Sequence, residues 1–179
     1  MIGQDESHCV YNKLLGCLPY VDELIFVDGG SIDNTVALVG SIPKSRVYHV
    51  PFPDHFAQQR NECLKHATKD WILIKDCDEL FDFDLLYNLQ SYTQMGGDAV
   101  AFPRKTYIDG SLYNFDAQEH FDRTIRFWEN HKGIHFENKL HECVVGFETM
   151  KTANAWLIHP KTNAEQQKDN QKYHAMGQR

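Results

Sequence analysis

One stretch decides the fold class: residues 23–35, which read ELIFVDGGSIDNT. Its first half is an apolar run too short for a helix, and Gly29 and Gly30 end it, so it predicts a buried strand over residues 23–28. Ser31 and Asp33 are good N-cap residues and predict a helix that continues to about Val39. Strand, turn and helix in this order are typical of an α/β protein.

The same theme repeats on both sides of this stretch. Residues 46–50 predict a second strand, which makes the helix between the two a right-handed crossover between parallel strands. Residues 71–74 predict another buried strand, after a helix that Asp54 would cap and before a helix that Asp82 would cap. An amphipathic helix over residues 7–18 precedes them all. A mainly parallel, Rossmann-like sheet flanked by helices is therefore expected over residues 1–95.

The character of the chain changes after Gly96 and Gly97. Short β-like pieces follow, at residues 99–102, 106–108, 124–128, 143–145 and 155–158. They predict a mixed or antiparallel second half over residues 96–162. Residues 163–179 are polar and predict a surface helix. We find no linker, so residues 1–179 are expected to form a single domain.

Composition excludes several classes of protein. The chain has 179 residues, of which 42% are hydrophobic and 24% charged, as in an ordinary globular domain. Its 18 basic and 25 acidic residues give a net charge of −7 without a basic cluster, which argues against a polymeric nucleic acid as partner. We expect no integral membrane segment and a cytoplasmic location, because no apolar run approaches about 20 residues. The five cysteines form no C-x-x-C pair and predict reduced thiols.

Two loops at predicted strand ends carry candidate ligands. In the first, Asp28 and Gly30 precede a helix start, where backbone amides can face an anion; an ordinary helix cap is the alternative. The second, residues 76–79, reads DCDE directly after a buried strand. Carboxylates crowded in this way repel one another unless a cation lies among them, and hard oxygen ligands suit Mg²⁺ or Mn²⁺. The alternative is favourable interaction with a helix N-terminus.

Three further residues could contribute chemistry. Arg60 offers a bidentate grip on phosphate or carboxylate, or else forms a surface ion pair. Glu142 follows His141 and could act as a general base, or the two could simply be the polar face of a strand. His159 follows the apolar residues 156–158 and is either a metal ligand or a structural histidine.

Three motifs in order resemble a known family. Residues 27–35, then Gln59-Arg60-Asn61, then residues 76–79 resemble a family-2 glycosyltransferase over nearly the whole chain. The resemblance implies a nucleotide-diphospho-sugar transferase (GT-A) fold and a divalent cation, Mn²⁺ or Mg²⁺, held on the donor diphosphate by the D-x-D element. It also implies transfer of a sugar, with inversion, from a nucleotide-diphosphate donor such as a UDP-sugar to a hydroxyl acceptor.

The resemblance also implies roles for individual residues. Asp28 would receive the nucleobase beside Gly30, Arg60 would contact the nucleotide, and Asp76 would position the ribose or metal. The implied metal ligands are Asp78 and His159.

For the proton of the acceptor hydroxyl, we predict Glu142 as the general base in preference to Glu79 or Asp116. Glu79 neighbours the expected metal, and a cation makes a nearby carboxylate a poor base. Asp116 lies in a polar stretch expected to be a loop, whereas Glu142 begins the apolar run at residues 143–145, which can hold it in place.

The chain departs from the family pattern in places. Its first strand is a stub at Met1-Ile2, Gly29 replaces a second aspartate, Lys75 occupies a usually apolar position, and the chain stops soon after His159. We therefore expect a short form or a fragment. Two other functions remain open: a nucleotidyltransferase, although its glycine- and lysine-rich phosphate loop is absent, and a binding remnant that has lost activity.

Overall fold

The computed structural model describes residues 1–112 and 123–176. Its first sheet has three parallel strands in the order β1-β2-β3: β1 (Ile2–Gly3), β2 (Leu24–Asp28) and β3 (Ser45–His49). The helix α2 (Thr35–Gly40) forms the crossover between β2 and β3, and Asp33 accepts a hydrogen bond from the backbone N–H of Thr35 at 2.9 Å. The strand, turn and crossover predicted from residues 23–50 are confirmed. The cap prediction is wrong: the N-cap residue is Asn34 and not Ser31 or Asp33, and its side chain makes no cap hydrogen bond.

The second sheet has seven strands within the residues that the structure describes, and its topology is mixed. Its central order is β4 (Trp71–Leu73), β8 (Arg123–Glu129), β6 (Ala99–Ile108), β12 (Leu157–Lys161) and β5 (Leu80–Phe81). Two short strands, β7 (Ser111–Leu112) and β11 (Met150–Thr152), pair with β6. The expectation of a mixed second half is confirmed.

The strand β4 does not belong to the parallel sheet in which the sequence analysis placed it. It pairs antiparallel with β8 and not with the parallel sheet, with Leu73 opposite Phe127. The rings of Trp71 and Phe127 stack with centroids 4.8 Å apart, a favourable aromatic arrangement. The pairing moves residues 76–79, which follow β4, to the boundary between the two halves of the chain.

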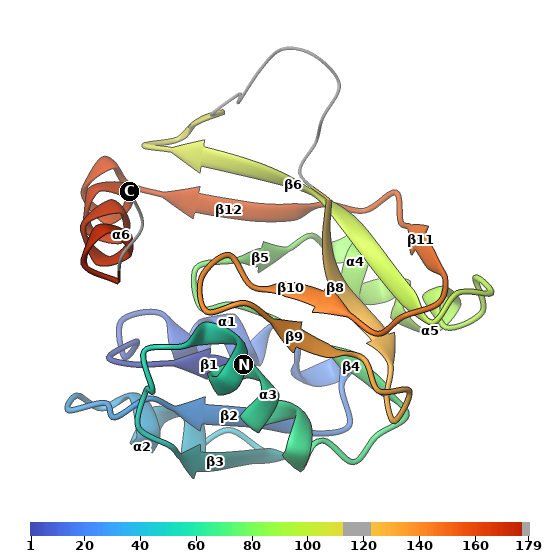
Figure 1. The fold of residues 1–179 in the computed structure, drawn as a ribbon, viewed down its shortest axis with the longest axis horizontal. Coiled ribbons are helices and arrows are strands. Elements are labelled where there is room, and N and C mark those ends of the chain that lie inside the picture. The colour runs from blue at the N-terminus through green and yellow to red at the C-terminus, as the bar shows by residue number, and fades with distance from the viewer. Residues whose placement is uncertain (113–122, 177–179) are drawn as a thin grey trace.

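A hairpin links the two halves (Figure 1). Its strands β9 (His135–Glu137) and β10 (Cys143–Val145) are antiparallel. It packs on α3 (Phe56–His66) through Asn61, whose side chain donates to the carbonyl of Phe136 and accepts from its N–H, both at 2.9 Å. The side chain of Asn61 thus satisfies both backbone groups of Phe136 and fixes the hairpin relative to the helix.

Of the N-caps predicted for α4 (Phe83–Tyr87) and α3, the first is confirmed and the second is wrong. Asp82 accepts from the N–H of Leu85 at 2.8 Å and begins α4, which is followed by α5 (Leu89–Tyr92). The prediction of Asp54 as the cap of α3 is wrong: His55 is the cap, and its ring accepts from Gln58 N. Asp54 instead has a φ of 53°.

Two other helices differ from the predicted ranges. The first, α1 (Val10–Leu15), is shorter than residues 7–18, and a 3₁₀ turn (Leu18–Tyr20) follows it. The last, α6 (Asn163–Ala175), starts with a reciprocal capping pair between Thr162 and Glu165 and lies at the end of β12 (Figure 1). Within residues 1–112 and 123–176, the helices are too short and too polar to cross a bilayer.

Three apolar clusters form the core. One lies between the parallel sheet and its helices around Phe26, and another lies under β6 around Phe102. The third joins α3, β4, β8 and the hairpin, with Trp128 against Phe136 at a ring-centroid distance of 5.6 Å. This third cluster holds α3 and β8 together, and each of them supplies an arginine to the site described next.

Candidate active site

A cavity of about 1340 Å³ lies between the two halves of the chain. Its lining comes from the turn after β1, from α3, from residues 76–79, and from β8, the hairpin, β12 and α6. The residues singled out from the sequence that line it include Arg60, Asp76, Asp78, Glu79, Glu142 and His159. They come from four separate segments of the chain, so the fold itself brings them to one cavity.

Arg60 is the centre of a buried ion network on one wall of this cavity. Its guanidinium binds Asp76 in a bidentate manner, at 2.6 and 3.0 Å, and its Nε donates to Glu142 Oε1 at 2.7 Å. The same guanidinium lies 5.3 Å from the ring centre of Phe136. Two carboxylates from different parts of the chain therefore hold Arg60, and the alternative of a surface ion pair is wrong.

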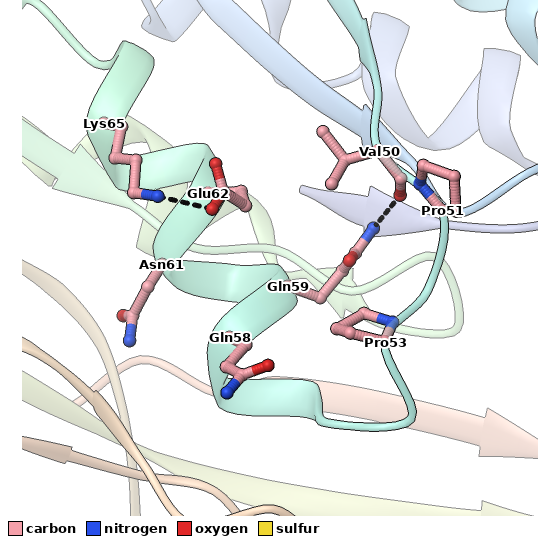
Figure 2. A pocket seen from close by; sticks show the side chains of 8 residues that line it. All are labelled: Val50, Pro51, Pro53, Gln58, Gln59, Asn61, Glu62 and Lys65. Atoms are coloured by element: carbon pink, nitrogen blue, oxygen red, sulfur yellow. Dashed lines mark hydrogen bonds and ion pairs between the residues drawn. The ribbon is translucent and has the colours of Figure 1, made fainter.

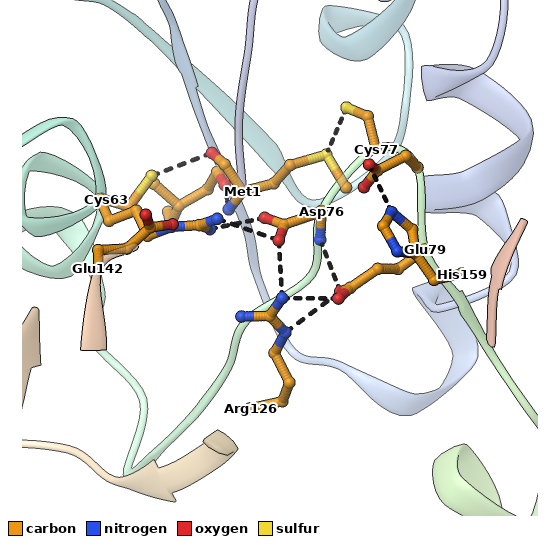
Figure 3. A network of polar contacts seen from close by, with 11 residues as sticks. Met1, Cys63, Asp76, Cys77, Glu79, Arg126, Glu142 and His159 are labelled. Atoms are coloured by element: carbon orange, nitrogen blue, oxygen red, sulfur yellow. Dashed lines mark hydrogen bonds and ion pairs between the residues drawn. The ribbon is translucent and has the colours of Figure 1, made fainter. Parts of the chain in front are cut away.

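A second arginine, Arg126 on β8, completes the network (Figure 3). It donates to Asp76 at 2.7 Å and to both oxygens of Glu79, at 2.6 and 3.2 Å. Sequence reasoning missed this residue as part of the site. The available signal was an arginine within the apolar run Ile125-Arg126-Phe127-Trp128, where a charge requires buried partners.

The network sets the charge state of its members. Burial alone would raise the pKa of Asp76, but Arg60 and Arg126 hold it well below its usual range. Burial would lower the pKa of Arg60, and the neighbouring Asp76 and Glu142 raise it instead. Three carboxylates thus meet two guanidiniums, so this wall offers an incoming diphosphate no net positive charge.

The two implied metal ligands lie together. His159 Nε2 is 2.8 Å from Asp78 Oδ2, and Lys161 Nζ lies 3.9 Å from the same oxygen. Burial would raise the pKa of Asp78, but the hydrogen bond with His159 holds it below its usual value. The pair presents one carboxylate and one imidazole to the cavity, a donor set that can hold a divalent transition metal.

The loop of Asp28 lies outside the lining. Asp28 is fully buried, and its carboxylate accepts from Gly30 N at 3.1 Å and Ser31 N at 3.2 Å and contacts His49 Nδ1 at 2.7 Å. Gly30 has a φ of 109°, which favours glycine. Neither Asp28 nor Gly30 is among the described residues that line the cavity. Gly3 does line it, and its carbonyl accepts a hydrogen bond from the N–H of Gly29. A contact of Asp28 with a nucleobase stays a prediction.

The three candidate bases occupy different settings. Glu142 lines the cavity, and the contact of its Oε1 with Arg60 fixes its position. Glu79 also lines the cavity, but it is 1% exposed and bound to Arg126, which fits a supporting role. Asp116 lies outside the described residues.

A smaller cavity, of about 290 Å³, lies on another side of α3 (Figure 2). Gln59 is on its wall and donates from Nε2 to the carbonyl of Val50 at 2.8 Å. Gln59 Oε1 is buried without a hydrogen-bond partner among the described residues. The amide of Gln59 therefore ties α3 to the segment after β3 and leaves one buried acceptor unsatisfied.

Taken together, the fold and the site define an α/β protein of the GT-A type, with a parallel nucleotide-binding-like sheet and a mixed second sheet facing one cavity. The sequence model of glycosyl transferase family 2 matches residues 9–154. The chain belongs to this family, as its motifs imply.

Two curated proteins resemble this chain in sequence, and one of them is itself a glycosyltransferase. A TPR repeat-containing protein of Synechococcus elongatus is 32% identical over 146 residues, and the SPbeta prophage-derived glycosyltransferase SunS of Bacillus subtilis is 25% identical over 145 residues. These alignments cover 80% and 74% of this chain but only 34% and 32% of the relatives. The chain thus spans about a third of the length of the two curated relatives.

Solved structures agree on the fold. S. aureus TarS 1–349 covers 98% of this chain at 14% identity with a TM-score of 0.64, and the match spans 61% of that structure. TarS 1–349 in complex with UDP matches with a TM-score of 0.68 at 13% identity and covers 98% of this chain and 63% of its own. The expected GT-A fold class is confirmed.

Proposed function

We propose that this chain is a glycosyltransferase that moves a sugar from a nucleotide-diphosphate donor to a hydroxyl acceptor. Membership of glycosyl transferase family 2 and the fold shared with a UDP-bound relative support this reading. The observation that carries it is the convergence of Asp78 and His159, 81 residues apart in the sequence and 2.8 Å apart in space, on a cavity large enough for a nucleotide sugar. Residues 1–95 would supply the donor side and residues 96–162 the acceptor side.

The charges of the cavity wall favour a cation-assisted donor site. Within the buried network, Asp76, Glu79 and Glu142 outnumber Arg60 and Arg126, so a diphosphate placed against this part of the wall meets carboxylates unless a cation lies between them. Basic side chains elsewhere on the lining, among them Lys13, Arg104 and Arg123, can contact other parts of the donor. Asp78 and His159 would hold that ion, which would stabilise the negative charge that builds on the departing diphosphate. An oxygen and an imidazole nitrogen suit Mn²⁺ better than Mg²⁺, which prefers oxygen ligands alone.

Glu142 is the residue we assign to the acceptor proton. Arg60 donates from Nε to its Oε1 at 2.7 Å, so Glu142, like Glu79, neighbours a guanidinium. We prefer Glu142 because this contact fixes it on the hairpin side of the cavity, whereas Glu79 directly follows the proposed metal ligand Asp78. A base in this position would take the hydroxyl proton as the acceptor attacks the sugar in one displacement, and that displacement inverts the anomeric centre. Arg60 therefore acts as a positioning residue for both Glu142 and Asp76.

Donor binding provides the direct test. Calorimetry with UDP should show binding that depends on added Mn²⁺, and incubation with a panel of UDP-sugars should show slow release of UDP. Asp78→Asn should abolish both, whereas Asp109→Asn, a control carboxylate on the same cavity, should keep them. UDP affinity that is equal with Mn²⁺ and with excess chelator would refute the metal assignment, and absence of binding by any nucleoside diphosphate would refute the function.

A further inference from the structure

A second group of ligating side chains lies on the cavity lining, in the turn between β1 and α1. One carboxylate oxygen of Glu6, one ring nitrogen of His8 and the thiol of Cys9 all lie within 4.8 Å of one another, the tightest such group of three among the described residues. The Sγ of Cys9 is 3.5 Å from Glu6 Oε2. Three different kinds of ligand atom thus converge from four consecutive residues.

We propose that Glu6, His8 and Cys9 form a Zn²⁺-binding site on the wall of the cavity, with ligands different from Asp78 and His159. A thiolate, an imidazole and a carboxylate are the ligands that Zn²⁺ takes in proteins, and a thiolate disfavours Mg²⁺ and Mn²⁺. Zinc bonds of about 2.0–2.3 Å place ligand atoms roughly 3.3–3.8 Å apart around one ion. The Glu6–Cys9 contact already has this spacing, and the exposed His8 needs only a small movement to close the set.

The backbone of the turn is held in place before any ion binds. The N–H of Glu6 donates to Thr35 Oγ1 at 2.7 Å, and the N–H of Ser7 donates to Asp33 Oδ2 at 3.1 Å. Asp5 and Ser31 make a further bond of the same kind at 2.9 Å. Such preorganisation lowers the entropic cost of closing a metal site.

Cobalt substitution tests the proposal without any enzymatic readout. The full chain, titrated with Co²⁺, should develop a thiolate-to-metal charge-transfer band, which the Asp78 and His159 site cannot produce because it contains no sulfur. Cys9→Ser should remove the band while keeping a good N-cap residue for α1, and His8→Ala should weaken it. Cys143→Ser is the matched control, because Cys143 is an exposed thiol on the same cavity.

Zinc affinity gives the second measurement, by competition with a chromophoric chelator. Cys9→Ser and His8→Ala should each lower the affinity at least 10- to 100-fold, the effect of losing even an outer partner of a metal ligand. Asp78→Asn should leave the charge-transfer band in place. A band that persists in Cys9→Ser, or that disappears in Cys143→Ser, would overturn the site; equal zinc affinity in the parent, Cys9→Ser and His8→Ala would do so as well.

Discussion

Replacing Arg126 by methionine should destabilise the fold more than any surface change of the same kind. Arg126 is 6% exposed and is the partner of two carboxylates, those of Asp76 and the 1%-exposed Glu79. Methionine keeps much of the volume but removes all three hydrogen bonds, so the buried Glu79 loses its arginine and the partly buried Asp76 loses one of two. Removing one partner from a buried ion pair costs about 3–5 kcal/mol of the free energy of unfolding.

Urea denaturation of Arg126→Met and the parent measures this loss. Arg46→Met is the matched control, since Arg46 pairs with Glu23 at the surface and an exposed pair contributes only about 0–1 kcal/mol. Adding Glu79→Gln to Arg126→Met should recover part of the loss, because the added substitution removes one of the stranded charges. A loss below about 1 kcal/mol in Arg126→Met, equal to that of the control, would refute the view that the network is a buried, mutually dependent unit.

The remaining predictions concern acid stability, caps, the hairpin and catalysis. The hydrogen bonds to buried Asp28 outweigh its desolvation and lower its pKa. The charged carboxylate therefore stabilises the fold above about pH 4, the usual range of aspartate, and this stabilisation is lost as the pH falls through the pKa of the folded state. In Asp28→Asn, the free energy of unfolding measured with urea should fall less steeply as the pH is lowered. Asp82→Ala should lower the free energy of unfolding by about 1 kcal/mol in the same assay, through loss of the α4 cap. Asn61→Ala should cost about 1–3 kcal/mol and speed hydrogen exchange at Phe136, and unchanged exchange there would contradict the link between hairpin and helix. Glu142→Gln should keep UDP affinity and lose roughly 10²- to 10⁴-fold in transfer rate; near-parental transfer would remove Glu142 as the base.

Local patterns were sufficient for part of the fold. The strand β2, its glycine turn and α2 follow from one apolar run and the polar residues after it, although the N-cap is Asn34 and not Ser31 or Asp33; both signals act over a few neighbouring residues. The Asp82 cap followed for the same reason, as did the surface helix after residue 162, although its observed end is Ala175. The short strands β5, β9 and β11 were missed, because two or three residues are too few to show a period.

Pairing between distant segments was not predictable in the same way. The sequence predicts two strands at residues 99–102 and 106–108, but β6 runs unbroken through Pro103. Pro103 lies where β6 changes partners: residues 99–103 pair with β8, and pairing with β12 starts at Arg104. A proline, which lacks an N–H, is tolerated at such a changeover. Likewise, nothing near residues 71–74 indicates that β4 pairs with β8.

For the site as well, local sequence patterns identified some residues, whereas contacts between distant segments were not predictable. Residue type and position at a strand end were enough to single out Asp76, Asp78 and His159, and the structure brings all three to one cavity. Arg126 and the role of Arg60 as a bridge were beyond reach, because both depend on which carboxylates the fold brings near. The sequence therefore identifies side chains that can act as ligands, but it does not show which charged side chains lie next to them in the fold.

The bridge through Arg60 has a consequence for how the two halves of the chain act together. Arg60 binds Asp76, which lies two residues before the proposed metal ligand Asp78, and also binds Glu142, the proposed base on the hairpin. Asn61, the next residue on α3, holds the same hairpin through Phe136. A shift of α3 would therefore move the proposed donor side and the proposed acceptor side of the cavity together. Because transfer requires donor and acceptor to be aligned, a rigid α3 that carries both contacts would maintain that alignment.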